Sequence, residues 1–420
     1  MNNSPRIRMA MGCTLLVTAL GASVTSCGGS GHPLSAKPYD AAGEISFSGE
    51  SGSKKTDPDK PIEITSEGDE ARITDVTATD QIGRYVVGEL SADGTRWHST
   101  APLAADAHYT VHVSTEDDEG SPGRKVLTFD TGHPKKNKSL KVTFGPEAGK
   151  YGVGQPVTAE LSAAVKDKAA RAVVERALKV DSQPAVAGSW TWVDDKTLHF
   201  RPEEYWPAGA TVEAHSTLDG IKVGDRLWGG ASKPLRLTIG DRIEAVTDAG
   251  SHSMTVYRNG RVINTIPVTT GKPGFETRNG VKVVLGKERF VRMRSTSIGI
   301  AEGSSDSYDM PVYFATRVTW SGEYVHAAPW STGSQGYANV SHGCTGMSTS
   351  NAEWFFNTVR TGDIVKVINS NGAQMDPFGN GFGDWNLSWK NWEKGSAVQA
   401  AATENGGHST VQAARLSPEV

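Results

Sequence analysis

The stretch Ser341-His342-Gly343-Cys344-Thr345-Gly346-Met347 places a cysteine between glycines and close to a histidine. A second histidine, His326, lies 18 residues upstream of Cys344, in Tyr324-Val325-His326-Ala327-Ala328-Pro329-Trp330. The chain has only three cysteines, and the other two, Cys13 and Cys27, lie near its start. Because a cysteine attacks as its thiolate, it needs a base or a positive field beside it. The stretch therefore predicts a cysteine nucleophile with a histidine base.

The first 27 residues have the pattern of an export signal. Arginines precede an apolar stretch, residues 9–20, which is too short to span a bilayer comfortably. The stretch leads to Val24-Thr25-Ser26-Cys27, the pattern of a bacterial lipobox. We expect residues 1–26 to be a lipoprotein signal peptide and Cys27 to carry the lipid; an ordinary signal peptide is the alternative. The expected location is the outer face of the cell membrane, within the cell wall, with the lipid as the only anchor.

This interpretation leaves Cys344 without a disulfide partner, because Cys13 is removed with the signal peptide and Cys27 is lipidated. A lone thiol in an exported protein is exposed to oxidation, and catalysis is the commonest reason for keeping one. The net charge of −4 and the lack of a basic stripe argue against nucleic acid as a partner.

The chain divides by composition into several segments. Residues 27–60, rich in Gly, Ser, Lys, Asp and Pro, predict a flexible tether. Residues 61–136 carry short alternating runs separated by turn signals, which predict an immunoglobulin-like β-sandwich. The pattern recurs over residues 137–240 and predicts a second, related sandwich, with a helical insert at 166–179.

The third part of the chain, residues 241–369, predicts a separate β-rich domain. Asn259-Gly260 between two alternating runs is a strong hairpin signal. Apolar residues at helical spacing over 352–359 predict one main helix. Residues 370–395 contain several tryptophans and are expected to pack back onto this domain, with packing favoured over a sugar-binding platform. The tail, residues 396–420, is expected to be disordered.

The order of histidine and cysteine separates the classes of cysteine enzyme. Papain-like cell-wall endopeptidases place the cysteine first, whereas here His326 comes first. Sortases share this order but need a later arginine, and Arg360, on the far part of the predicted helix, is the only one in the 70 residues after Cys344. Gly343 and Gly346 are expected to leave backbone N–H groups open for an oxyanion, as acyl transfer requires.

Residues 241–395 resemble the L,D-transpeptidases, especially the actinobacterial kind with tandem immunoglobulin-like domains. The resemblance rests on Val325–Ser331, Ser341–Cys344, Ser348–Val367 and Gly383–Asn386. It implies a mainly β fold: two tandem Ig-like β-sandwiches, then a β-rich catalytic domain with one main helix, then a Trp-rich C-terminal subdomain. It also implies that no metal ion or cofactor is needed.

The resemblance implies roles for individual residues. Cys344 is the expected nucleophile and His326 its base, oriented by the backbone carbonyl of Ala327. His342 is expected to shape the pocket and the turn, although its proximity to Cys344 makes it a rival base. The expected substrate-binding residues are Met293, Tyr308, Ser321, Gly322, Trp330, Ser341, Gly343 and Gly346. Relatives often have Asn or Arg where this chain has Gly346, and an aromatic residue where it has Ile298.

The implied activity is cross-linking of peptidoglycan. Cys344 attacks a tetrapeptide stem after its third residue, D-Ala leaves, and the third residue of a neighbouring stem attacks the thioester. Carbapenems are the expected covalent inhibitors. Two alternatives remain open: an L,D-carboxypeptidase, in which water replaces the amine, and a non-enzymatic wall-binding lipoprotein. For His326 the alternative is a purely structural histidine.

Overall fold

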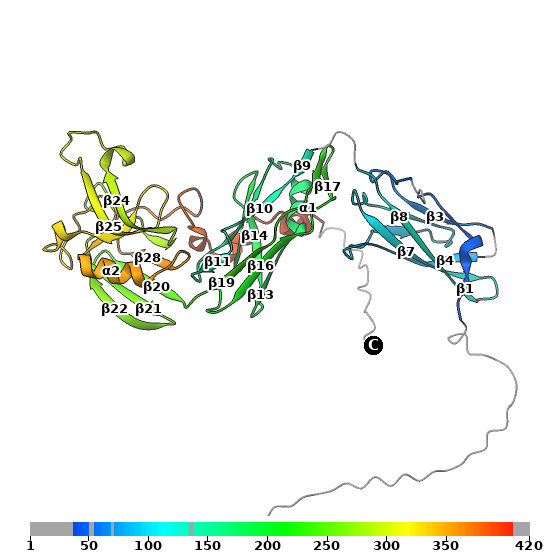
Figure 1. Ribbon diagram of the computed structural model, residues 1–420, viewed down its shortest axis with the longest axis horizontal. Helices are drawn as coiled ribbons and strands as arrows, with labels where there is room; N and C mark the ends of the chain where they lie inside the picture. The colour runs from blue at the N-terminus through cyan, green and yellow to red at the C-terminus, as the bar shows by residue number, and fades with distance from the viewer. Residues whose placement is uncertain (1–36, 50–53, 69–70, 134–137, 406–420) are drawn as a thin grey trace, which may run out of the picture.

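The computed structural model describes residues 37–49, 54–68, 71–133 and 138–405. Figure 1 shows three β-rich units in a row, from the N-terminal unit in blue to the C-terminal unit in yellow and orange. The prediction of a mainly β fold is confirmed. None of the helices in these ranges is long and apolar enough to cross a membrane. The predicted signal peptide and Cys27, the predicted site of the lipid, lie outside the described residues.

The first unit is a sandwich of two four-stranded sheets. One sheet has the order β1 (Tyr39–Asp40), β8 (Pro122–Asp130), β7 (His108–Asp117), β4 (Ala71–Asp80), and the other β2 (Ile45–Phe47), β3 (Glu63–Ser66), β6 (Arg96–Ser99), β5 (Gly88–Leu90). The prediction of a flexible tether is wrong for residues 39–47. Their backbone pairs with the sandwich, β1 parallel to β8 and β2 antiparallel to β3, although their composition resembles that of a linker.

The second unit is also a sandwich. Its sheets are β10 (Val142–Gly145), β12 (Val157–Leu161), β15 (Thr197–Pro202), β14 (Gly188–Trp192), and β11 (Gly149–Tyr151), β19 (Leu235–Ile239), β16 (Thr211–Ser216), β13 (Leu178–Gln183). A small sheet joins β17 (Lys222–Gly224), β18 (Leu227–Gly229) and β9 (Lys138–Leu140). The predicted insert forms helix α1 (Lys168–Ala177), capped by Asp167, whose carboxylate accepts from the Ala170 N–H at 2.8 Å.

The third unit contains two sheets and one long helix. The sheets are β22 (Arg261–Pro267), β21 (Ser253–Arg258), β20 (Ile243–Asp248), β28 (Ile364–Ile368), β23 (Gly280–Val283), and β24 (Gly286–Arg294), β25 (Asp309–Arg317), β26 (Tyr324–Ala327), β27 (Thr345–Met347). Asn259 and Gly260 form the predicted hairpin turn between β21 and β22, with φ of 50° and 79°. Helix α2 (Thr349–Thr358) buries Ala352, Phe355 and Phe356, as its apolar spacing predicts. Short 3-10 helices occupy Ala41–Gly43, Ser295–Ile298, Pro329–Ser331 and Asp384–Asn386.

The Trp-rich segment joins the second and third units. Trp392 donates from its indole N–H to the Ser189 carbonyl at 2.9 Å, and Trp385 donates to the Gly154 carbonyl at 2.9 Å. Both acceptors belong to the second unit. The rest of the segment packs on the catalytic domain as expected, because the Asn279 N–H donates to the Ala373 carbonyl at 2.9 Å and the Ser321 N–H to Asn380 Oδ1 at 2.7 Å. Asn386 retains a link to that domain, because its side-chain amide donates to the Val281 carbonyl at 2.8 Å.

Arg201 lies at the centre of this junction. Its side chain is buried, and its guanidinium carbon lies 4.7, 5.4 and 4.6 Å from the ring centroids of Trp385, Trp389 and Trp392. It also donates to the Leu387 carbonyl at 2.8 Å. Cation–π contacts of a desolvated arginine hold aromatic rings in place. The guanidinium therefore fastens the Trp-rich segment to β15.

The chain continues beyond this segment as an ordered helix. After α3 (Trp389–Glu393), α4 (Ala397–Asn405) occupies residues predicted to be disordered. Its first N–H, at Ala397, donates to the carboxylate of Glu175 on α1 at 2.7 Å. This alanine-rich segment is thus helical, and the carboxylate of Glu175 caps the start of the helix.

Candidate active site

Strand pairing brings the predicted nucleophile and base together. β26 and β27 are parallel neighbours in register Val325 to Thr345 and His326 to Gly346, and Cys344 directly precedes β27. Because strand side chains alternate, His326 lies on the face opposite Val325, which belongs to the hydrophobic core. His326 is the third of the four residues of β26. Both residues line one cavity.

The cavity has a volume of about 310 Å³. Besides Cys344 and His326, the predicted site residues that line it are Met293, Tyr308, Trp330, Ser341, His342 and Gly346. Sequence reasoning missed Thr269 and Asp306, which also line it. The predicted substrate contacts Ser321 and Gly322 are not among its lining residues.

His326 has the orientation of a general base. Its Nδ1 lies 2.8 Å from the backbone carbonyl oxygen of Ala327, which can only accept. This contact assigns the proton to Nδ1 and leaves Nε2 with a free lone pair. Burial lowers the pKa of His326, so the imidazole is neutral at pH 7. The Trp330 ring stacks on it at a centroid distance of 6.0 Å.

The Cys344 thiol is protonated in this structure's environment. Burial raises its pKa to about 12; the Tyr324 backbone N–H and Lys282 oppose this rise, whereas Glu323 adds to it. Sγ donates to the Gly322 carbonyl oxygen at 3.6 Å. Gly322, expected to contact substrate, is thus the acceptor for the resting thiol. A neutral thiol and a neutral imidazole therefore share the cavity.

The turn before Cys344 is closed by its own side chains. Gly343 has φ of +112°, and its N–H donates to Ser341 Oγ at 3.2 Å. That hydroxyl donates to the Cys344 carbonyl at 2.6 Å, while the Gly346 N–H donates to the Thr269 carbonyl at 2.9 Å. The expectation that Gly343 and Gly346 leave N–H groups open is wrong, because Ser341 and Thr269 occupy both. Within residues 138–405 the Cys344 N–H has no acceptor, which makes it available to an oxyanion.

The contacts of His342 do not suit a general base for Cys344. Its Nε2 lies 3.4 Å from a carboxylate oxygen of Asp306, and its ring packs against Phe275 at 4.7 Å and Tyr308 at 5.2 Å. Lys272 forms an ion pair with Asp306, and its hydrogen bond lowers the pKa of that carboxyl. Asp306 lies in a Gly- and Ser-rich loop without a motif, so no pattern in the sequence singles it out.

Gly346 is sterically constrained. A Cβ atom there would lie 3.0 Å from the Ala328 Cβ and 3.1 Å from the Thr269 Cγ2. Both neighbours belong to the cavity wall or the strands beside it, so a larger residue requires them to move. A glycine at position 346 thus matches the local packing. The side chain of Ile298, the other departure, lies outside what the structure describes.

The described residues contain no group of three or more His, Cys, Asp or Glu side chains that could hold a metal ion.

Comparison with known proteins gives two family matches. Residues 242–367 match the L,D-transpeptidase catalytic domain (YkuD), and residues 53–222 match a bacterial Ig domain. L,D-transpeptidase 2 of Mycobacterium tuberculosis is 32% identical over 401 residues, covering 93% of this chain and 96% of that protein. L,D-transpeptidase 5 of the same species is 31% identical over 420 residues, covering 96% and 90%. The solved structure of LD transpeptidase LdtMt1 in complex with imipenem is 36% identical over 55% of this chain and 100% of its own, with a TM-score of 0.48.

Proposed function

Since the chain belongs to the L,D-transpeptidase family and is an acyltransferase, we propose that it cross-links peptidoglycan stem peptides through a thioester on Cys344. One observation carries the proposal: Cys344 and His326 line the same cavity on paired strands, with Nδ1 of His326 fixed by the Ala327 carbonyl. This arrangement has the parts that thiol acyl transfer needs, namely a nucleophile, a base and an orienting group.

The first half-reaction forms the acyl-enzyme. Nε2 of His326 takes the thiol proton as Sγ of Cys344 attacks the carbonyl carbon between the third stem residue and the terminal D-Ala. The Cys344 N–H donates to the resulting oxyanion. Collapse breaks the C–N bond, and the imidazolium gives its proton to the departing amine of D-Ala. A thioester remains on Cys344.

The second half-reaction transfers the acyl group. The side-chain amine of the third residue of a neighbouring stem attacks the thioester carbonyl, and His326 takes the amine's proton. The C–S bond breaks, the thiolate recovers that proton, and a link between two third residues forms. No metal or cofactor takes part in these steps.

A neutral Cys344 thiol beside a neutral His326 imidazole is consistent with this order of reaction steps. Burial raises the pKa of Cys344 and lowers that of His326, so an ion pair between them is unfavourable. Proton transfer is then concerted with attack on a bound carbonyl. The proposal includes Tyr308, Met293 and Trp330 as walls of the donor site, because they line the same cavity.

The remainder of the chain is assigned a spacing role. We place the lipid on Cys27 at the outer face of the cell membrane, with the two sandwiches holding the site at a distance within the wall. The row of units in Figure 1 supports such a spacer.

Product analysis tests the proposed reaction. Purified enzyme is incubated with a disaccharide-tetrapeptide, with and without an acceptor stem bearing a side-chain amine, and the products are identified by mass spectrometry. The expected product is a dimer joined through third residues, formed with one equivalent of D-Ala. Tripeptide alone, in the presence of acceptor, would instead establish the carboxypeptidase. If neither the dimer nor the tripeptide forms, the wall-binding alternative remains. Family membership and the intact Cys344–His326 pair argue against that alternative.

Carbapenems should acylate the same thiol, because a β-lactam carbonyl is a reactive acyl donor. Intact-protein mass spectrometry after incubation with imipenem should show the mass of one added drug molecule, and peptide mapping should place it on Cys344. The control is Tyr337→Ala, which changes an 82% exposed side chain and should be acylated at the wild-type rate. An unmodified wild-type mass would contradict the proposed nucleophile.

A further inference from the structure

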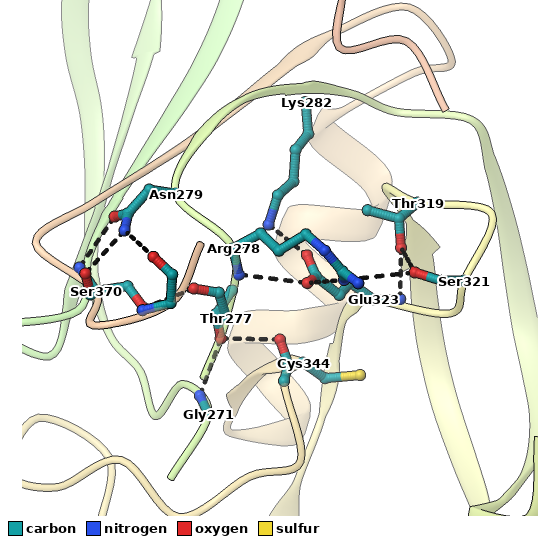
Figure 2. A network of polar contacts seen from close by, with 12 residues as sticks. Gly271, Thr277, Arg278, Asn279, Lys282, Thr319, Ser321, Glu323, Cys344 and Ser370 are labelled. Atoms are coloured by element: carbon teal, nitrogen blue, oxygen red, sulfur yellow. Dashed lines mark hydrogen bonds and ion pairs between the residues drawn. The ribbon is translucent and has the colours of Figure 1, made fainter. Parts of the chain in front are cut away.

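A buried ion pair lies beside the nucleophile and takes no part in the steps above. Lys282 on β23 and Glu323, directly before β26, form an ion pair with side chains 1% and 8% exposed. Nη1 of Arg278 contacts the other carboxylate oxygen of Glu323 at 2.8 Å. Figure 2 shows the three side chains gathered next to Cys344. Buried ion pairs seldom improve stability over apolar residues of the same size, so this one calls for a functional explanation.

The pair is linked to the thiol through the backbone. Glu323 follows Gly322, the residue whose carbonyl accepts from Sγ of Cys344. The Glu323 N–H donates to Thr319 Oγ1 at 2.8 Å, and Gly322 has φ of +101°. The carboxylate also accepts from the Arg278 backbone N–H at 3.3 Å. These contacts fix the turn 319–323 and, with it, the carbonyl that holds the thiol.

The same stretch that carries Lys282 also holds the other side of the nucleophile. Thr277 Oγ1 accepts from the Gly271 N–H at 2.9 Å, as Figure 2 shows. The same hydroxyl donates to the Gly343 carbonyl at 2.8 Å. Residues 277–282 therefore contact both the turn before Cys344 and the turn whose Gly322 carbonyl accepts a hydrogen bond from the thiol. Movement of the ion pair would be transmitted to the thiol from both directions.

The ion pair also dominates the charge around the thiol. The titratable groups that face Cys344 from the surrounding elements are Lys282, Glu323, Tyr308, Tyr324, His326 and His342, and Arg278 lies behind Glu323, with which it pairs. Burial raises the pKa of both tyrosines and lowers that of His326, so these three are neutral at pH 7. Across the cavity, Asp306 is paired with Lys272. Lys282, Arg278 and Glu323 therefore supply the local charge.

We infer that Lys282 and Glu323 are positioning residues that set the reactivity of Cys344, by fixing the Gly322 carbonyl and by balancing a buried cation against a buried anion beside the thiol. Glu323 disfavours the thiolate and Lys282 favours it, while Arg278 offsets the charge of Glu323 through their ion pair. The balance keeps the proton on sulfur until His326 takes it. The inference rests on the proposed role of Cys344 as nucleophile.

The test is the alkylation of Cys344 by iodoacetamide, followed by mass spectrometry of its peptide at several pH values between 7 and 9.5. Lys282→Met and Arg278→Gln each remove a cation and should slow the reaction about threefold at every pH. Glu323→Gln removes the anion and should speed it about threefold. A neighbouring charge shifts a thiol pKa by about one unit, and the lower nucleophilicity of a more acidic thiolate offsets part of the gain.

The direction of the changes in alkylation rate distinguishes an electrostatic effect of the substitutions from a loosening of the structure. Loosening of the site would expose the thiol and speed alkylation in all three variants, whereas the inference requires opposite signs. Arg278 is 36% exposed, so Arg278→Gln supplies the cation test even if Lys282→Met does not fold. Equal rates, or changes of the same sign in Arg278→Gln and Glu323→Gln, would overturn the inference. Since alkylation needs no peptide substrate, this result is independent of whether the enzyme cross-links stems.

Discussion

Replacing Cys344 with alanine should abolish both D-Ala release and cross-link formation, with a loss of at least about 10³-fold, because the covalent route disappears with the sulfur. The fold should be retained. Cys344 is only partly buried, and its hydrogen bond is a long one, from Sγ to the Gly322 carbonyl at 3.6 Å. Release of D-Ala from a tetrapeptide stem measures the activity, and circular dichroism measures the fold.

Cys344→Ser is the matched control, because it retains a hydrogen-bond donor of similar shape. It should also be inactive, since a serine hydroxyl is far less acidic than a thiol and His326 cannot activate it to the same extent. Residual cross-linking by the alanine variant would place the nucleophile elsewhere and refute the mechanism.

Replacing Arg201 with methionine should lower the free energy of unfolding by about 3 kcal/mol or more. The substitution removes three cation–π contacts and leaves the carbonyls of Pro202, Glu203 and Leu387 without their donor. Burial lowers the pKa of Arg201 to about 10, so the charge is present at pH 7 and its loss is felt there. Tryptophan fluorescence during denaturation in guanidinium chloride reports the change.

Arg171→Met is the matched control for this measurement. Arg171 also stacks on one tryptophan, Trp192, at 4.7 Å, but it is 23% exposed and pairs with Asp195, which is 44% exposed. Its loss should change the free energy of unfolding by no more than about 1 kcal/mol. Equal effects of the two substitutions would show that the Trp-rich segment is held by something other than the buried guanidinium.

The fold class and the paired Cys344 and His326 could be predicted because their signals are local. Alternation marks strands, and the two motifs place each residue on or directly before one. That the Gly346 N–H already has an acceptor could not be predicted in this way. It depends on Thr269, a residue on a distant part of the chain whose carbonyl the sequence does not connect to this turn.

Buried charge was equally hard to predict. Lys282 interrupts an apolar run, Val281 to Leu285, and that interruption is the signal that could have indicated a buried partner. Its partner Glu323 lies 41 residues away with no periodic relation to it. Composition gave a wrong prediction of flexibility for two segments. Residues 39–47 are ordered by strand pairing with β8 and β3, and residues 397–405 by the contact with Glu175 on α1.

The most direct test of the mechanism is detection of the acyl-enzyme itself. Wild-type enzyme is mixed with a tetrapeptide donor in the absence of acceptor, quenched in acid, digested and mapped by mass spectrometry. The mechanism predicts a tripeptide stem joined as a thioester to Cys344, with one equivalent of D-Ala released in the same interval and the adduct discharged on addition of acceptor amine. Release of D-Ala without any adduct on Cys344, from an enzyme that still forms cross-links, would contradict it.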